Sequence, residues 1–324
     1  MYNSTQLLQV VNDTINALPL EHNPQGLYAP IRYVLSLGGK RIRPVLMLMA
    51  YNLYKDDIKT CLMPAVGIET FHNFTLLHDD LMDRAEVRRG KECVHRKWDD
   101  NTAILSGDNM LVLAFQYLTH CDEKKLPAVM QIFSKTAVEI DEGQQYDIEF
   151  ESRNDVTEAE YIEMIRLKTS VLLACALQIG ATLADAPEED IHELYRFGEC
   201  LGLAFQLQDD YLDVYGDPAV FGKKIGGDIL CNKKTFMLIN ALLHASKEDR
   251  AELLQWIDSK DCSPEEKISA VTAIYTKTGV DQMAKERMNS YYTEAEASLA
   301  KVNIPEERKQ MLHELALELM GRQK

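Results

Sequence analysis

A DDxxD motif occurs twice in this chain, and each copy follows an apolar helical run. The first copy occupies residues 79–83 after the run 71–77, and the second occupies residues 209–213 after the run 201–205. The first and last aspartates of a copy are four residues apart, so they share one face of a helix. Paired carboxylates of this kind repel each other unless a cation lies between them. The duplication therefore predicts two helices that face each other across a polar cavity.

The donor set fits a hard divalent cation. Mg²⁺ prefers oxygen ligands and is commonly held by one or two carboxylates together with substrate phosphates. A single motif is equally compatible with an acidic helix end before a basic turn, but the second copy favours a metal site. We predict that metal ions bridge a polyphosphate between the two motifs. The candidate ligands are Asp79, Asp80, Asp83, Asp209, Asp210 and Asp213.

Basic side chains suited to phosphate lie at two places near the first motif. Arg88 and Arg89 follow it directly, and guanidinium groups bind phosphate oxygens in a fork. Earlier in the chain, a Gly38-Gly39 turn leads into Lys40, Arg41 and Arg43, with Pro44 in the first turn of the next helix. This segment is either a phosphate cradle made by Lys40 and Arg43 or an ordinary basic loop.

Two further segments carry polar residues inside apolar helical runs. His72 precedes Asp79 by seven residues and lies on nearly the same helix face, so it is either a core histidine or a ligand contact. Lys168 and Thr169 interrupt an apolar run. A buried lysine without a partner is costly, which favours a substrate phosphate, although a side chain that reaches out to solvent is the alternative.

Composition favours one soluble, all-helical domain over residues 1–324. Glycine (16) and proline (10) are sparse, and no linker, low-complexity segment or convincing strand alternation is present. We expect helices over 2–18, 27–37, 61–83, 100–119, 125–150 and 188–214, another that begins at Thr157 with Glu160 closing a capping box, and further helices to residue 321. The glycine- and lysine-rich segment 213–228 is expected to be a loop that acts as a lid.

Charge and cysteine usage limit the partners and the compartment. A net charge of −16 argues against nucleic acid or an anionic membrane as a partner. The seven cysteines are scattered without a CxxC pair, as in a reduced cytoplasmic protein. The first nine residues lack a signal-peptide core, and the apolar stretch 171–184 is too short to be a transmembrane segment.

In the order and spacing of these motifs, the chain resembles the trans-isoprenyl diphosphate synthases of the polyprenyl synthetase family over residues 27–240. The resemblance implies an all-α, single-domain helical bundle around a deep central cavity, with Mg²⁺ (three ions) as cofactor and a homodimer as the assembly. Its substrates would be isopentenyl diphosphate and an allylic diphosphate (dimethylallyl, geranyl or farnesyl).

The resemblance also implies roles for individual residues. Isopentenyl diphosphate would contact Lys40, Arg43, His72 and Arg89, and the allylic diphosphate would contact Arg88, Lys168, Thr169, Gln206, Lys223 and Lys233. The residues expected to act in catalysis are Asp79, Asp83, Asp209, Arg88, Lys168 and Lys233. Asp213 is a weaker ligand candidate than Asp209.

Product length in this family depends on bulk just before the first motif. Phe74 followed by the small Thr75, with Phe71 one turn earlier, resembles synthases that make C20 chains. A helical wheel places Thr75 beneath Asp79, Phe71 to one side and Phe74 pointing away. We therefore expect geranylgeranyl diphosphate as the product, with farnesyl diphosphate as the alternative.

Three other functions compete with chain elongation. A terpene cyclase of the same fold usually has an Asn/Ser/Glu second metal site, whereas this chain has a second complete DDxxD. A non-catalytic partner subunit typically lacks one acidic motif, and an acidic metal-binding protein without enzymatic activity does not need the basic residues. Elongation of an allylic primer therefore fits the sequence best.

Overall fold

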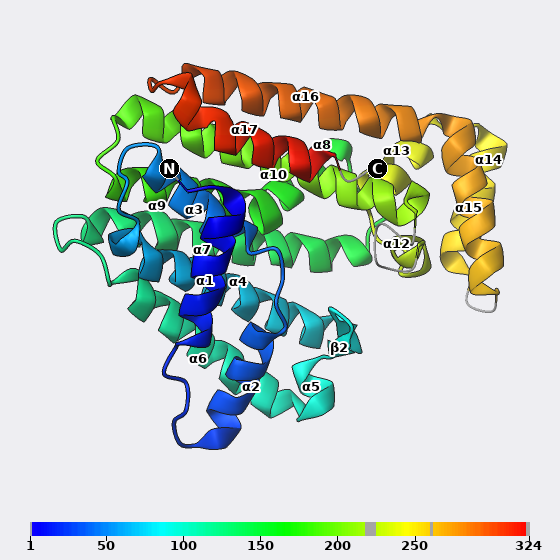
Figure 1. The fold of residues 1–324 in the computed structure, drawn as a ribbon. Helices are drawn as coiled ribbons and strands as arrows, with labels where there is room; N and C mark the ends of the chain where they lie inside the picture. Colours follow the sequence, from blue (N-terminus) through cyan, green and yellow to red (C-terminus); the bar gives the residue numbers. More distant parts are fainter. Residues whose placement is uncertain (1, 218–224, 260–261, 322–324) are drawn as a thin grey trace. The chain divides into compact units, whose positions relative to one another are not determined.

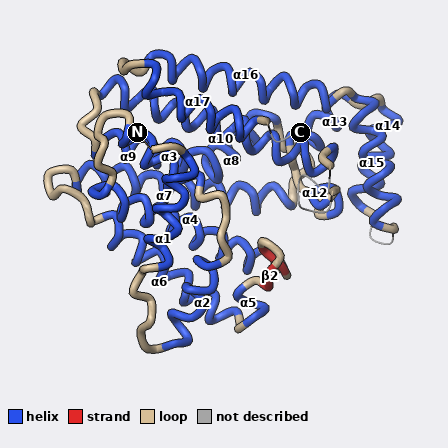
Figure 2. Tube along the Cα trace, viewed as in Figure 1, coloured by secondary structure: helices blue, strands red, loops and turns tan. Residues whose placement is uncertain are grey.

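The computed structural model describes residues 2–217, 225–259 and 262–321. Within these residues helices supply nearly all of the regular structure, and a short hairpin is the exception (Figure 2). The all-α expectation is confirmed. The described helices are α1 (Ser4–Asn16), α2 (Gln25–Ser36), α3 (Ile42–Asn52), α4 (Lys59–Met82), α5 (Val94–Lys97), α6 (Asp100–Leu118), α7 (Leu126–Glu151), α8 (Glu158–Ile165), α9 (Val171–Leu183), α10 (Glu188–Tyr215), α12 (Gly227–Leu230), α13 (Phe236–His244), α14 (Lys247–Asp258), α15 (Pro264–Thr278), α16 (Val280–Lys301) and α17 (Glu306–Met320).

The chain forms two compact units. Unit 1 comprises residues 1–134, 175–194 and 303–312, and unit 2 comprises residues 135–174, 195–302 and 313–324. Several helices in Figure 1, among them α7 and α10, contain residues of both units. The first acidic motif belongs to unit 1 and the second to unit 2.

In unit 1, α3 and α4 form the centre of the core. α3 is buried from Pro44 to Asn52, and α4 is buried without interruption from Pro64 to Phe71. α4 packs against both α3 and α6. Helices covered on all sides bury apolar residues all round rather than in one stripe, which explains why the segment before the first motif is largely apolar, with Glu69 as a buried exception.

In unit 2, the core is assembled around the second half of α10. Leu203, Leu207 and Val214 of α10 pack in one cluster with side chains of α8, α13 and α15, such as Tyr161 and Tyr275. Those positions follow a helical repeat, so one face of α10 is buried. Asp210, which is three residues after Leu207, lies on that buried face.

Local sequence signals place the helix ends well. Thr157 caps α8, and its side chain and that of Glu160 form the expected capping box. Pro44 lies in the first turn of α3, as predicted, and Asp83 is the C-cap of α4. These ends depend on contacts between residues a few positions apart, which a sequence shows directly.

Three features differ from the sequence-based expectation. The chain after the first motif, where no strand was expected, contains a two-stranded antiparallel hairpin, β1 (Val87–Arg88) and β2 (Lys91–Glu92), because Arg89 and Gly90 both have positive φ and reverse the chain. Residues Arg166–Ser170 form a turn of π-helix, η1, instead of α-helix. Within the expected lid 213–228, α10 extends to Tyr215, and residues 218–224, which include Lys223, lie outside the described residues.

One apolar helical segment is long enough either to span a membrane or to form part of the protein core. The described helical segment Glu158–Leu183 has the length and hydropathy of a membrane span, but 78% of its most apolar window is buried inside the protein. Helices at the centre of soluble proteins have the same composition. The burial assigns this segment to the protein core.

Candidate active-site residues

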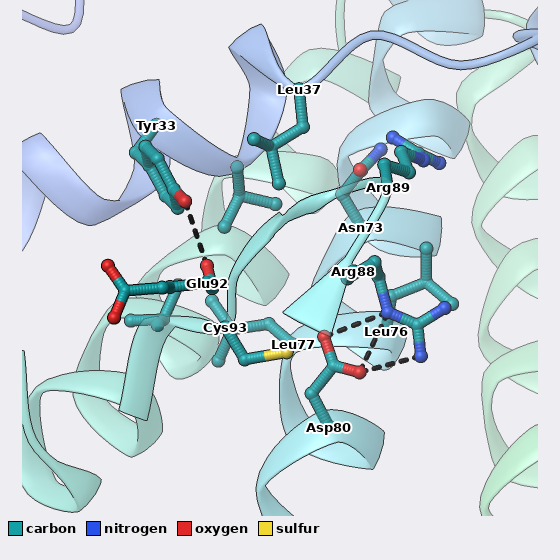
Figure 3. Close-up of a pocket in the computed structure, with 12 residues that line it drawn as sticks. Tyr33, Leu37, Asn73, Leu76, Leu77, Asp80, Arg88, Arg89, Glu92 and Cys93 are labelled. Carbon is teal, nitrogen blue, oxygen red and sulfur yellow. Dashed lines mark hydrogen bonds and ion pairs between the residues drawn. The ribbon is translucent and has the colours of Figure 1, made fainter. Parts of the chain in front are cut away.

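In the first motif, the middle aspartate points into unit 1. Asp80 follows Asn73 and Leu77 on the buried face of α4 and is 6% exposed. Nε of Arg88 on β1 donates to both carboxylate oxygens of Asp80, at 2.7 and 2.8 Å, and a terminal nitrogen of Arg88 lies 2.6 Å from Oδ1 (Figure 3). Desolvation lowers the pKa of Arg88, but its bonds to Asp80 and the charge of Asp79 outweigh this and raise the pKa overall.

The outer aspartates of the first motif lie nearer to solvent. The Asp79 side chain is 19% exposed, and its Oδ2 is 3.8 Å from Arg88. Asp83 is exposed at the C-cap of α4, where its N–H donates to the carbonyl of Asp79 at 2.9 Å. Asp79 and Asp83 thus retain the i,i+4 relation predicted for a shared metal ion, while Asp80 remains a predicted ligand whose carboxylate binds Arg88.

The cations after the glycine turn have different surroundings, and Arg41 is paired inside the protein whereas Arg43 is not paired with a carboxylate among the described residues. Gly38 and Gly39 have φ of +73° and +129°, conformations that residues with a side chain rarely adopt. A terminal nitrogen of Arg41 donates to Glu69 at 2.7 Å, and both side chains are 2% exposed. Arg41 therefore fixes the turn to α4, while Arg43 on α3 remains for other partners.

Arg43 and His72 form the polar centre predicted for isopentenyl diphosphate. They approach to 3.2 Å, and Nε of Arg43 is buried without a hydrogen-bond partner in the described structure. Burial lowers the pKa of Arg43 to about 10, although Glu69 raises it. Burial, followed by the charges of Arg43, Arg89 and Arg88, also lowers the pKa of His72 well below its usual value. His72 is therefore neutral at neutral pH, and its neighbourhood is strongly positive.

Arg89 completes this basic cluster from the hairpin. It donates to the carbonyl of Gly38, and a Cβ on Gly39 would come within 2.9 Å of its guanidinium carbon. Desolvation, followed by the charges of Arg41 and Arg88, lowers the pKa of Arg89 despite Glu69. Lys40, the remaining predicted phosphate contact, is exposed on the same turn.

A small cavity of unit 1 adjoins the Asp80–Arg88 pair. It is lined mainly by apolar side chains, among them Leu37, Leu76 and Leu77, and Cys93 closes one side (Figure 3). Burial and then Asp80, by its charge and a hydrogen bond, raise the pKa of the Cys93 thiol to about 12. The thiol is therefore protonated at neutral pH and is a hydrogen-bond partner of Asp80.

In the second motif, the middle aspartate is again the inward one. Asp210 is 3% exposed; Oδ2 accepts a short hydrogen bond from the Tyr161 hydroxyl, and Oδ1 accepts one from Gln206 at 3.2 Å. Burial, followed by the charge of Asp228, raises the pKa of Asp210 to about 8, although the bonds from Tyr161 and Gln206 lower it. Unlike Asp80, Asp210 has no cationic hydrogen-bond partner within the described part of unit 2.

The other two aspartates of this motif differ from each other. Asp209 is partly exposed, one helical step from the buried face of α10. Asp213 is 8% exposed, and its Oδ2 accepts the N–H of Asp228 at 3.0 Å. Asp209 is thus more accessible than Asp213, and both remain predicted metal ligands.

The predicted allylic-diphosphate residues of unit 2 are concentrated on η1 and α10. Lys168 pairs with Asp147 of α7 at 2.6 Å, so the protein supplies an anionic partner for this lysine, and its contact with substrate stays a prediction. Thr169 donates to Gln206 at 3.2 Å. Lys233 is exposed just after α12, and its N–H donates to the carbonyl of Asp228 at 2.9 Å.

The predicted chain-length residues belong to an aromatic cluster of unit 1. Phe71 is 1% exposed and meets Phe133 of α7 edge-to-face, with ring centres 4.9 Å apart. Phe74 lies between Phe71 (5.5 Å) and His78 (4.8 Å). Thr75 donates to the carbonyl of His72 at 2.8 Å, so its methyl group is the part left for apolar contact.

Comparisons with known proteins decide the family. The family model described as polyprenyl synthetase matches residues 24–275. The chain belongs to the polyprenyl synthetase family. The resemblance to the trans-isoprenyl diphosphate synthases is thereby confirmed. The chain is a trans-prenyltransferase of the short-chain isoprenyl diphosphate synthase type.

Individual members of the polyprenyl synthetase family are similar over most of their length. A short chain isoprenyl diphosphate synthase of Methanocaldococcus jannaschii is 43% identical over 241 residues, which are 74% of this chain and 73% of that protein. A crystal structure of a geranylgeranyl pyrophosphate synthase matches with a TM-score of 0.94 and 42% identity over 100% of both chains. A geranylgeranyl pyrophosphate synthase of Corynebacterium glutamicum complexed with isoprenyl diphosphate and magnesium matches with a TM-score of 0.88 and 28% identity over 98% of both chains.

Sequence reasoning did not find several residues that hold the predicted ones in place. Cys93 and Tyr161 each bind a predicted aspartate from a buried position, and Glu69 binds Arg41 of the glycine turn. A buried acid within an apolar run, such as Glu69, was a usable signal because it requires a cationic partner. Nothing in the sequence pairs Tyr161 with Asp210, which is 49 positions away.

Proposed function

We propose that this enzyme condenses isopentenyl diphosphate with an allylic diphosphate to give geranylgeranyl diphosphate. The observation that carries the proposal is the basic cluster of Arg43, Arg89 and neutral His72, in which a buried guanidinium nitrogen of Arg43 lacks a partner in the described structure. The charge of Arg89 lowers the pKa of Arg43, and the charges of Arg41 and Arg88 lower that of Arg89. Neighbouring arginines of this kind are stabilised by an anion, and a diphosphate provides several acceptor oxygens. Lys40 is proposed to extend this site.

The residues of the two motifs fit magnesium. Asp79 and Asp83 share a helix face, Asp209 is partly exposed, and hard carboxylate oxygens are the ligands that Mg²⁺ takes alongside substrate phosphates. We propose three ions. Asp80, Asp210 and Asp213 are more buried than the other aspartates of the motifs, and we propose that they support the ligands Asp79, Asp83 and Asp209. When bound, magnesium neutralises charge on the departing diphosphate. The Corynebacterium relative supports this assignment.

The proposed reaction breaks the allylic carbon–oxygen bond, and its electron pair leaves with the diphosphate. Arg88, Lys168, Thr169, Gln206 and Lys233 hold that diphosphate in place and stabilise its growing charge. The terminal double bond of isopentenyl diphosphate forms the new carbon–carbon bond with the allylic carbon. A proton then passes to the released diphosphate, and the product is five carbons longer. Lys223, outside the described residues, is proposed as a further contact.

The assembly and the compartment follow from other features. α6 exposes Ile104, Leu105 and Val112 at 45%, 61% and 54%, and an apolar helix face of this kind is suited to a homodimer contact. The absence of a CxxC pair in the sequence and the buried segment 158–183 support a cytoplasmic enzyme that does not insert into a membrane. Because α7, α9 and α10 each contain residues of both units, we propose that the units act as one catalytic domain.

One incubation tests the function. The purified protein is incubated with Mg²⁺, isopentenyl diphosphate and either dimethylallyl, geranyl or farnesyl diphosphate, and the products are identified by mass spectrometry. We expect a C20 diphosphate from each primer. A C15 diphosphate as the end product supports the farnesyl alternative. A cyclic hydrocarbon identifies a cyclase, and no product from any primer identifies a non-catalytic subunit.

A further inference from the structure

Three hydrogen bonds connect four polar side chains of unit 2. We call this set the ring, because both of its ends lie on the continuous α8–η1 segment. Thr169 of η1 donates to Oε1 of Gln206 at 3.2 Å, and Nε2 of Gln206 donates to Oδ1 of Asp210 at 3.2 Å. The Tyr161 hydroxyl donates to the other oxygen of Asp210, and Tyr161 lies on α8, which runs directly into η1. The ring thus leaves the α8–η1 segment at Thr169 and returns to it at Tyr161.

The orientation of the Gln206 amide depends on this ring. Its oxygen accepts from Thr169 and its nitrogen donates to Asp210, so rotating the amide by 180° would break both bonds. The bond from Tyr161 to one oxygen of Asp210 restrains the carboxylate whose other oxygen accepts from Gln206. The Tyr161 hydroxyl is therefore the fixed point from which the other three side chains are ordered.

Tyr161 is well suited to be a fixed point. It is 2% exposed, and its N–H donates to the carbonyl of the capping residue Thr157 at 3.0 Å. The capping box is itself held, because Arg153 donates to Glu160 at 2.9 Å. A buried aromatic ring on an anchored first helical turn has little freedom to move.

Close backbone packing places the ring where small shifts matter. A Cβ on Gly202 of α10 would lie 2.6 Å from Cα of Ser170, and a Cβ on Gly143 of α7 would lie 2.4 Å from the backbone nitrogen of Lys168. Both glycines thus allow η1 to contact its neighbours backbone to backbone. π-helical turns are rare and frequently lie at functional sites, and the Thr169–Gln206 hydrogen bond of the ring links this one to α10.

We propose that Tyr161 is a positioning residue that sets the relative placement of Thr169, Gln206 and the second acidic motif, and thereby the affinity for the allylic diphosphate. Tyr161 does not touch substrate in this proposal; it acts through Asp210 and Gln206. The inference rests on the proposed function, since it assigns the η1–α10 residues to the allylic substrate. Simple satisfaction of a buried carboxylate is the competing explanation, and it predicts an effect on stability alone.

The test is a double-mutant cycle of Tyr161→Phe and Thr169→Val, with steady-state kinetics for each substrate in saturating Mg²⁺. We expect Tyr161→Phe to raise KM for the allylic diphosphate about tenfold, and Thr169→Val, which also loses its proposed contact with the diphosphate, to raise it at least as much. The double variant should match Thr169→Val alone, because both changes break one ring. KM for isopentenyl diphosphate should stay within about twofold. The matched control is Tyr215→Phe, because Tyr215 also lies on α10 and its hydroxyl contacts Thr276 of α15 at 3.2 Å. This variant should leave both KM values unchanged.

Three outcomes overturn the proposal while prenyl transfer by the wild type still stands. They are additive effects in the cycle, equal changes in both KM values, and a Tyr161→Phe variant that loses thermal stability but keeps its KM. Assays are run well below the lowest melting temperature of the set, so that loss of fold does not enter the kinetics. If the wild type itself elongates no primer, it is the proposed function that fails, and the cycle is not reached.

Discussion

The two acidic motifs share a spacing but differ in how each accommodates its buried middle aspartate. In unit 1, Asp80 is bound by the guanidinium of Arg88 through contacts of 2.6 to 2.8 Å. In unit 2, Asp210 is bound by the neutral donors Tyr161 and Gln206 and faces the charge of Asp228. A cation compensates a buried carboxylate directly, whereas neutral donors compensate it only in part. The pKa of Asp210 accordingly rises to about 8.

The difference shows that identical motifs can have different electrostatic roles. The Asp80–Arg88 pair orders a cation that is itself expected to contact substrate, so the pair couples the metal motif to the diphosphate. The Asp210 set instead orders neutral side chains and leaves net negative charge near the metal-binding aspartates. A magnesium ion is the natural counter-charge for that excess. Variants at matched positions of the two motifs can test each half of this contrast.

The largest effect is expected at the outer aspartates, where the two motifs should behave alike. Asp79→Ala and Asp209→Ala each remove a predicted metal ligand used in ionisation, and each should lower kcat a hundredfold or more, about 3 kcal/mol in the barrier. Asp13→Ala, which changes an exposed carboxylate of α1, is the control. Near-normal turnover in either ligand variant, with an unchanged circular dichroism spectrum, would refute the metal assignment.

The middle aspartates, Asp80 and Asp210, should differ in how they affect the pH dependence of protein stability. Because the folded state raises the pKa of Asp210 to about 8 from an ordinary value of 3.8, it binds more protons than the unfolded chain between these values. Stability of the metal-free protein should then fall as pH rises through this window, by at most about 1.4 kcal/mol per pH unit from this group. Chemical denaturation in EDTA at pH 5 and pH 8 measures the fall, and Asp210→Asn should remove its share.

Asp80→Asn is the matched variant in unit 1. It deprives the Arg88 guanidinium of its anionic partner, so it should destabilise the protein by about 1.5–3 kcal/mol. We expect a similar loss at pH 5 and pH 8, measured by the same denaturation series. If Asp80→Asn and Asp210→Asn show the same pH profile, the contrast between a cationic and a neutral environment is wrong.

The next effect distinguishes the two diphosphate sites. Arg43→Ala should raise KM for isopentenyl diphosphate about ten- to a hundredfold, the value of one charge-assisted contact, with little change in KM for the allylic primer. Lys168→Ala should show the reverse pattern. Arg84→Ala, which removes an exposed ion pair with Asp100, controls for the loss of a positive charge. An equal rise of both KM values in Arg43→Ala contradicts the assignment.

The smallest effect concerns product length. Phe74→Ala or Phe71→Ala should open apolar volume in unit 1 if either ring limits the growing chain, and longer products would gain about 0.8 kcal/mol per buried CH₂. Phe71 is held by Phe133 at 4.9 Å, so Phe74→Ala is the variant expected to disturb the fold less. Mass spectrometry of the products decides; Phe197→Ala, far along the chain in unit 2, is the control for core truncation. Unchanged chain lengths in both variants would place the limit elsewhere.

Much of the fold was predictable because its signals are local. The capping box at Thr157 and Glu160, the proline in the first turn of α3 and the largely apolar run of α4 each follow from residues a few positions apart. The hairpin β1–β2 and the π-turn η1 were not predictable in this way. The first depends on positive φ at Arg89, and the second depends on glycines of other helices that allow close packing.

By itself, the sequence determined the family and the all-α class, and it predicted the chemistry of the site, because a duplicated DDxxD with matched basic residues leaves few other uses for those side chains. Only the tertiary structure decided which carboxylates turn inward, which cations are already paired and which residues hold them. Arg41 with Glu69, Lys168 with Asp147 and Asp210 with Tyr161 are partners 21 to 49 positions apart. Charge pairing and burial depend on distances in space, and distances between remote residues exist only once the chain has folded.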